Sequence, residues 1–138
     1  MLISYVDGAI EPKNPGGVPA YGYVVFHDGV LIQEGYGLVE SPVKLTNNVA
    51  EFEAVIAALS YLVEMGLISE TVQIMSDSQL IINLSRGTKS TKMPHLRQLR
   101  QRVRELERNF VEVQYQWIPR EQNEYADMLS RLAYKLYA

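Results

Sequence analysis

The carboxylate of Asp7 stands inside an apolar opening segment, MLISYVDGAI, whose composition is typical of a buried β-strand. Removing an unpaired charge from water is costly, so a buried carboxylate normally has a partner, takes up a proton or binds a cation. Helix capping does not explain an acid in the middle of a strand. Asp7 is therefore the first candidate for a residue that does chemistry.

Three other acids are placed so that they could meet Asp7. Glu51 stands in the first turn of a predicted helix, Asp77 ends a predicted strand, and Asp127 lies in the first turns of the last predicted helix. Glu51 could instead form a capping box with Asn48. Asp77 could cap the helix that follows it, and Asp127 could simply interact with the positive end of the dipole of its own helix. If the strands of Asp7 and Asp77 are parallel neighbours, the acids converge at the carboxyl ends of the sheet.

Converging carboxylates repel one another unless cations lie between them. Oxygen ligands without a cysteine or histidine cluster suit Mg²⁺ or Mn²⁺. Two such ions, roughly 3.5 to 4 Å apart, are a common device for in-line attack on a phosphodiester. We therefore expect Asp7 to bind metal, with two Mg²⁺ ions for which Mn²⁺ can substitute.

The chain has 138 residues, 47% of them apolar, which suits a single domain, residues 1–138. Charged residues interrupt every apolar run before the roughly 18 residues of a membrane span, and Met1 is not followed by a signal region. The absence of cysteine excludes disulfides and thiolate metal sites. We expect a soluble, cytoplasmic protein without membrane contact, and a monomer.

The positive charge is segregated although the net charge is −3. Seven of the 13 Lys and Arg residues fall between Arg86 and Arg104, a window without Asp or Glu. This window is either a solvated helix face or a patch that faces phosphates, and the sequence leaves both interpretations open.

The order of predicted elements is βββαβααβα. Strands are predicted at residues 2–10, 21–27 and 31–39, with a hairpin turn at Asp28-Gly29. Apolar residues at helical spacing follow, from Asn47 to Gly66. Next come a strand at 71–77, helices at 78–85 and 96–109, a strand at 111–119 and a helix at 123–137. The long connections suit parallel crossovers, so we predict an α/β fold with a mixed sheet flanked by helices.

Five motifs, in order, resemble the type 1 ribonuclease H family. They are YVDGA in the first strand, NPGG in the next loop, LTNNVAEFEA at the long helix, MSDSQL after the fourth strand and WIPREQNEYADMLSRLA at the end. The match spans nearly the whole chain. The predicted element order agrees with a ribonuclease H-like fold, a five-stranded sheet of three antiparallel and then two parallel strands.

The resemblance implies metal-dependent endonucleolytic hydrolysis of the RNA strand of RNA/DNA hybrids, leaving 3′-hydroxyl and 5′-phosphate ends. It implies that Asp7 bridges both ions and that Asp127 completes the site that activates water. Glu51 and Asp77 would serve the second ion.

The resemblance also implies a set of substrate-binding residues. Asn14, Asn47 and Asn48 would contact the hybrid in its minor groove, where 2′-hydroxyls distinguish RNA from DNA. Turn formation and helix capping explain the same asparagines equally well. Thr46 and Lys44 resemble the family's pocket for a DNA-strand phosphate.

Two departures from the family pattern concern turnover and affinity. Arg120 stands where many members carry a loop histidine, and arginine attracts phosphate but does not shuttle protons near neutral pH. The basic helix that some members use as a substrate handle is missing, and the Arg-rich helix at 96–109 would have to replace it. His27 and His95 match no catalytic motif, so surface or packing roles are expected for both.

Other functions remain open at this point. A non-catalytic module that binds RNA-containing duplexes would not need all four acids. A transposase, integrase or exonuclease core shares the fold class but not the TNN sequence at the helix start. A receiver-like domain should begin with alternating βαβ elements. Cleavage of double-stranded RNA is a further alternative, since A-form geometry is shared.

Overall fold

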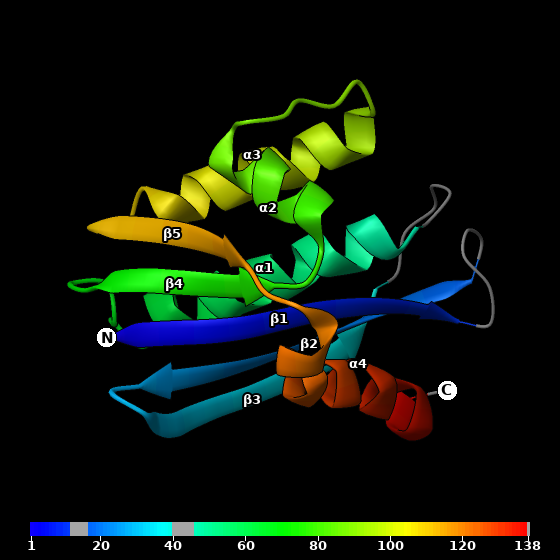
Figure 1. Cartoon of the computed structure of the whole chain (residues 1–138), viewed down its shortest axis with the longest axis horizontal. Coiled ribbons are helices and arrows are strands. Elements are labelled where there is room, and N and C mark those ends of the chain that lie inside the picture. Colours follow the sequence, from blue (N-terminus) through cyan, green and yellow to red (C-terminus); the bar gives the residue numbers. More distant parts are fainter. Residues whose placement is uncertain (12–16, 40–45, 138) are drawn as a thin grey trace.

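A computed structural model describes residues 1–11, 17–39 and 46–137, and its centre is a five-stranded sheet (Figure 1). The strands are β1 (Leu2–Glu11), β2 (Val18–His27), β3 (Val30–Leu38), β4 (Thr71–Ser76) and β5 (Glu112–Trp117). Their spatial order is β3-β2-β1-β4-β5. The β1–β2 and β2–β3 pairs are antiparallel, whereas β1–β4 and β4–β5 are parallel. The predicted mixed sheet is confirmed.

The hairpin between β2 and β3 turns at Asp28 and Gly29, as predicted. Their φ angles are 50° and 81°, and a two-residue turn that matches the twist of the strands requires positive φ at both positions. His27 consequently lies opposite Val30 in the register.

The helices follow the predicted order with one addition, a 3₁₀ turn. They are α1 (Asn47–Glu64), α2 (Gln79–Arg86), α3 (Pro94–Glu107), the 3₁₀ turn η1 (Arg120–Gln122) and α4 (Glu124–Tyr137). In the described part of the chain, no helix has both the length and the apolar character needed to span a membrane.

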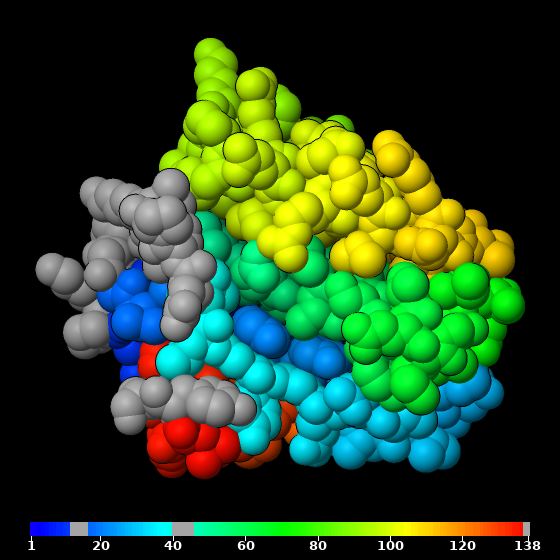
Figure 2. Space-filling model, turned by 180° about the vertical axis from the view of Figure 1, so that it is seen from behind, coloured from blue at the N-terminus to red at the C-terminus, as the bar shows by residue number. Residues whose placement is uncertain are grey.

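Two glycines allow helices to approach opposite faces of the sheet. A Cβ on Gly8 would lie 2.4 Å from the backbone nitrogen of Glu51 in α1, and one on Gly22 would lie 2.5 Å from the Ala126 carbonyl oxygen in α4. Gly22 pairs with Asp7, the neighbour of Gly8, so the two glycines point to opposite faces. Seen from behind, α1 and α3 lie side by side (Figure 2), whereas α4 crosses the front of the sheet (Figure 1).

The main core lies between the sheet and the pair α1 and α3. Its fully buried members include Leu2, Val6, Phe52, Val55, Leu59, Leu62, Val72, Ile74 and Leu96. Burying one such side chain stabilises the fold by roughly 1.5 to 3 kcal/mol before entropy is counted. This packing holds β1, β4 and α1 together, and these elements support three of the predicted acids.

Candidate active site

Three of the four predicted acids meet where β4 ends beside β1. One carboxylate oxygen from each of Asp7, Glu51 and Asp77 lies within 4.8 Å of the other two. Asp127 lines the same open cleft from α4. The structure therefore brings together acids from a strand, two helices and the bend after β4, as the sequence predicted.

The register of two parallel strands places Asp7 beside Asp77. Tyr5 is the last β1 residue aligned with β4, opposite Met75. Asp7 and Asp77 each stand two residues further along, just past the end of β4 at Ser76. Asp7 is only 5% exposed. The carboxyl group at this strand position is therefore buried, as the sequence suggested.

The bend that carries Asp77 is held by its neighbours. The Ser76 hydroxyl accepts the Ser78 N–H at 3.1 Å, and the Trp117 indole N–H donates to the Asp77 carbonyl at 3.1 Å. Ser78, not Asp77, caps α2, because its hydroxyl accepts the Ile81 N–H at 3.3 Å. The capping explanation for Asp77 is therefore wrong, and its carboxylate turns toward the cleft.

Glu51 reaches the site because α1 packs directly on Gly8. The helix begins at Asn47 after the N-cap Thr46, so Glu51 lies in the second turn rather than the first, and no capping box joins it to Asn48. Glu51 is 3% exposed and accepts a hydrogen bond from the Gly8 backbone. Its Oε2 atom is buried and has no partner among the described residues.

Asp127 is the most open of the four acids and is paired with a cation. Its backbone N–H donates to the Asn123 carbonyl at 3.1 Å in the first turn of α4. The Nε atom of Arg131, one turn later, lies 3.3 Å from both carboxylate oxygens. Arg131 also pairs with Glu11 at 3.2 Å, which ties α4 to the end of β1.

Burial and mutual repulsion favour the protonated acids. Burial, contact with Asp127 and the charge of Asp77 raise the pKa of Asp7 to about 8. Burial, followed by the charges of Asp7 and Asp77, raises the pKa of Glu51 well above its ordinary value. Burial also raises the pKa of Asp77, and Arg120 opposes that effect. The cluster therefore retains protons that exposed carboxyls would release.

This donor set fits a hard divalent cation. All the candidate ligand atoms are carboxylate oxygens, which are preferred by Mg²⁺ and Mn²⁺. Softer metals prefer sulfur or imidazole nitrogen ligands instead. The unpartnered Oε2 atom of Glu51 offers a lone pair in a buried place, and a cation would remove the repulsion that raises the pKa of its neighbours.

The predicted substrate-binding residues are only partly described. Thr46, Asn47 and Asn48 lie half-buried at the start of α1, and Asn47 lines the cleft. The Thr46 hydroxyl is buried without a partner among the described residues. Arg120 lines the cleft with its Nε atom 3.9 Å from Asp77, and its side chain is 92% exposed. Asn14 and Lys44 lie outside the described residues.

Three residues at the site were not singled out from the sequence: Trp117, Asn123 and Arg131. All three lie within the segment WIPREQNEYADMLSR, which the family resemblance covers. The family resemblance thus indicated that this segment belongs to the site. Residue spacing in an irregular turn, however, does not show which of its side chains point inward. The structure shows that each contacts an acid or its backbone.

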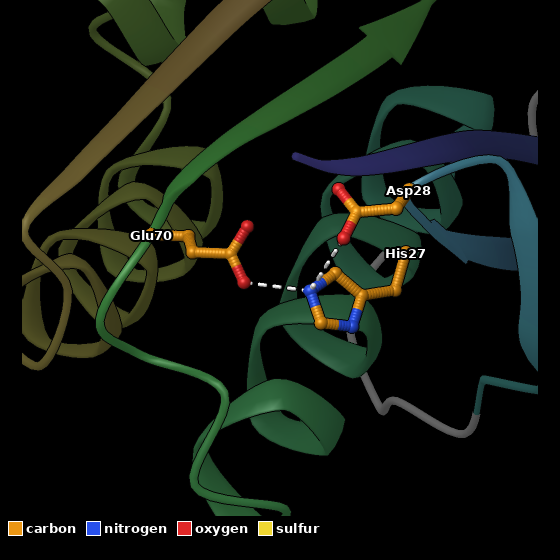
Figure 3. A group of neighbouring side chains, drawn as sticks. All are labelled: His27, Asp28 and Glu70. Atoms are coloured by element: carbon orange, nitrogen blue, oxygen red, sulfur yellow. Dashed lines mark hydrogen bonds and ion pairs between the residues drawn. The ribbon is translucent and has the colours of Figure 1, made fainter.

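A second group of side chains with possible ligand atoms lies at the opposite end of the sheet (Figure 3). The His27 Nε2 atom is 2.6 Å from Glu70 and 3.8 Å from Asp28, and the Met1 amine pairs with both acids. These contacts satisfy the group as an ion-pair clip between the β2–β3 turn and the start of β4. Neither His27 nor the half-buried His95 lines the cleft, which agrees with the expected surface or packing roles.

Comparison with known proteins identifies relatives over nearly the whole chain. The model of the "Reverse transcriptase-like" family matches residues 32–133. Ribonuclease HI of Halobacterium salinarum is 35% identical over 130 residues, covering 94% of this chain. The crystal structure of RNase H1 from that archaeon has a TM-score of 0.86 at 36% identity, with 97% of each chain covered.

A third relative was solved with nucleic acid. LC11-RNase H1, isolated from compost, has a TM-score of 0.87 at 31% identity over 96% of each chain, in a complex with an RNA/DNA hybrid. The chain spans 62% of the length of the curated Halobacterium protein. It spans 31% of the Mycobacterium tuberculosis "Bifunctional protein Rv2228c", to which it is 36% identical over 121 residues.

Proposed function

The chain belongs to the type 1 ribonuclease H family, and we propose that it hydrolyses the RNA strand of RNA/DNA hybrids, leaving 3′-hydroxyl and 5′-phosphate ends. The observation that carries this proposal is the convergence of Asp7, Glu51 and Asp77, with Asp127 lining the same cleft. A binding module would gain nothing from buried acids that repel one another. A metal-dependent nuclease needs them.

The proposed cofactors are two Mg²⁺ ions, with Mn²⁺ able to replace them. Asp7 would be shared between the ions, with Asp127 on the water side and Glu51 and Asp77 on the other. Such ions, when bound, supply a nucleophilic water and stabilise the leaving oxygen. Burial of Asp7 and Glu51 keeps bulk water from competing for their oxygens, and the Gly8 N–H and Trp117 indole hold Glu51 and Asp77 in place.

Residues beside the acids would select and orient the hybrid. Asn47 lines the cleft, and Asn48 and Thr46 flank it at the start of α1, where amides and a hydroxyl can pair with 2′-hydroxyls and phosphates. LC11-RNase H1, of the same fold, binds such a hybrid. Arg120 would attract a phosphate near Asp77 without transferring protons. Asn14 and Lys44 are proposed for minor-groove and phosphate contacts on the basis of the family motif.

Cleavage of one sequence prepared as RNA/DNA, RNA/RNA and DNA/DNA tests the proposal. Each duplex is incubated with Mg²⁺, Mn²⁺ or chelator, beside the Asp7→Asn variant. We expect metal-dependent cutting of the RNA strand in the hybrid and none by the variant. Additional RNA/RNA cutting would widen the substrate class. Tight hybrid binding without cutting under any condition would replace the proposal with the non-catalytic module.

We further propose that residues 1–138 act as a single-domain monomer in the cytoplasm. The described helices and strands share one sheet and one main core, which supports the first part. Light scattering coupled to gel filtration tests whether the protein is a monomer, and a mass near twice 15.7 kDa would contradict that part of the proposal.

A further inference from the structure

The junction between η1 and α4 contains a buried amide that the proposed reaction does not use directly. Asn123 is 1% exposed, although it stands in the irregular stretch that links β5 to α4. Its Oδ1 atom has no partner among the described residues. An unsatisfied buried acceptor lowers stability. The NH₂ group of the same amide is therefore expected to make a hydrogen bond that an apolar side chain could not make.

The donor half of this amide binds beside Asp7. The Asn123 Nδ2 atom donates to the Val6 carbonyl at 2.8 Å. Val6 is one residue past the last β1–β4 register pair, at Tyr5 and Met75, where β4 is about to diverge from β1. The Asn123 side chain therefore binds the β1 backbone at the point where β4 no longer pairs with it, one residue before Asp7.

Asn123 also contacts Asp77, in the bend after β4, and Asp127, in α4. Its side-chain amide lowers the pKa of Asp77, and its backbone carbonyl accepts the Asp127 N–H at 3.1 Å. Asn123 thus touches β1 beside Asp7, the carboxylate of Asp77 and the first turn of α4. The acids Asp7 and Asp77 are placed by paired strands, whereas Asp127 depends on how α4 is docked onto them.

We propose that Asn123 is a positioning residue, which sets the location of Asp127 relative to Asp7 and Asp77 and thereby completes the metal-binding cleft. The inference rests on the proposed function of that cleft. It predicts that the amide donor, rather than the volume of the side chain, is required. Groups that orient metal ligands from behind commonly change metal affinity or activity by roughly 10- to 100-fold when removed.

The test compares Asn123→Leu, which roughly keeps the volume but loses the donor without adding a charge, with Asn123→Ala, which loses both. Ser4→Ala is the matched control: the buried Ser4 hydroxyl donates to the Val24 carbonyl at 2.9 Å, on the same strand as Val6 but away from the cleft. Each variant is measured for melting temperature, for Mn²⁺ binding by calorimetry without nucleic acid, and for kcat and KM on the RNA/DNA hybrid.

We expect all three variants to melt at a lower temperature than the wild type. Only the two Asn123 variants should bind Mn²⁺ more weakly, by about tenfold or more, with kcat reduced similarly and KM for the hybrid little changed. Wild-type Mn²⁺ affinity and kcat in either Asn123 variant would overturn the inference, as would an equal decrease in Ser4→Ala. If the wild type binds Mn²⁺ but cuts no hybrid, the proposed function fails, and the Mn²⁺ affinities still decide the role of Asn123.

Discussion

At the scale of a single side chain, burial of the Asp7 carboxyl group opposes folding, a cost that the proposed function would explain. Asn at this position keeps the volume and removes a charge that Asp77 opposes and that raises the pKa of Glu51. We expect Asp7→Asn to lower hybrid cleavage by roughly a thousandfold or more, because several kcal/mol of metal-assisted stabilisation are lost. Without divalent ions it should raise the unfolding free energy at pH 8 by about 1 to 3 kcal/mol.

Urea unfolding in chelator and a cleavage assay check both parts of that prediction. Asp127→Asn is the matched control, because Asp127 is 39% exposed and already paired with Arg131. This control should lose activity without gaining stability. Equal stability gains in the two variants would contradict the role given to burial.

Protonation of the same residue predicts how stability depends on pH. The pKa of Asp7 is about 8 in the folded protein and near 3.8 when unfolded, so between these values the folded state binds the extra proton. The unfolding free energy should therefore fall as pH rises from 4 to 8, by up to about 1.4 kcal/mol per unit for one linked proton. The difference between wild type and Asp7→Asn, measured by urea unfolding between pH 5.5 and 8.5 in chelator, isolates this contribution. A difference that does not vary with pH would refute it.

At the scale of elements, the contact between α1 and β1 places Glu51. A Cβ on Gly8 would meet the backbone of Glu51 and Ala50 at 2.4 and 2.6 Å, and backbone atoms cannot move aside as side chains can. Gly8→Ala should therefore cost about 1 to 3 kcal/mol of stability and displace Glu51 enough to reduce cleavage strongly. Thermal unfolding and kcat are the measurements.

Gly66→Ala, at the other end of α1, is the control for this element. Gly66 has a φ of +72° but open space around it, so alanine there should cost about 1 kcal/mol and leave kcat unchanged. Wild-type activity in Gly8→Ala would show that α1 can shift without moving Glu51.

The arginines of α3 test whether its basic face binds phosphates. Arg97 donates to the Thr91 carbonyl at 2.8 Å and Arg104 pairs with Glu107 at 2.8 Å, but Arg100 has no such partner among the described residues. We expect replacement of Arg97, Arg100 and Arg104 by Gln to weaken hybrid binding. The slope of log K against log salt should fall by roughly 0.7 to 0.9 for each phosphate that these arginines neutralise in the wild type.

Arg102→Gln is the control on the same helix, because its ion pair with Glu53 at 3.0 Å directs Arg102 toward α1, whereas the partner of Arg104 lies on α3 itself. It should leave the salt slope nearly unchanged. An unchanged slope in the triple variant would assign the basic window to a solvated face that also supports the carboxyl end of α2, where Arg100 and Arg104 approach Gly87.

The sequence predicted those elements whose residues carry local signals. Asp28-Gly29 requires positive φ, the apolar spacing after Asn47 is helical, and long connections favour parallel strands, so the sheet and the meeting of Asp7 with Asp77 followed. Contacts between distant backbones leave no such periodic signal. The approach of α1 to Gly8, the cap at Ser78 and the inward turn of Asn123 therefore required the structure.

At the scale of the whole molecule, the acids and the ion-pair clip lie at opposite ends of β4. Glu70 directly precedes this strand, whereas Asp77 directly follows it and Asp7 lies beside that end. Acids at one end raise the free energy of the folded state, whereas at the other end His27, Glu70, Asp28 and the Met1 amine attract one another. The carboxylates that repel one another are thus separated from the ion pairs that join the start of β4 to the β2–β3 turn.

This separation predicts that the clip can be removed without affecting the reaction. His27→Ala deletes the 2.6 Å contact between the His27 Nε2 atom and Glu70 and should lower the melting temperature less than Gly8→Ala does, because the clip is partly exposed and its charges are screened. The decrease should shrink further in 1 M salt, while kcat on the hybrid and Mn²⁺ affinity stay at wild-type values. Melting curves at low and high salt, beside calorimetry with Mn²⁺, measure each part. A fall in Mn²⁺ affinity would show that the two ends of β4 are coupled through the sheet, because His27 does not line the cleft.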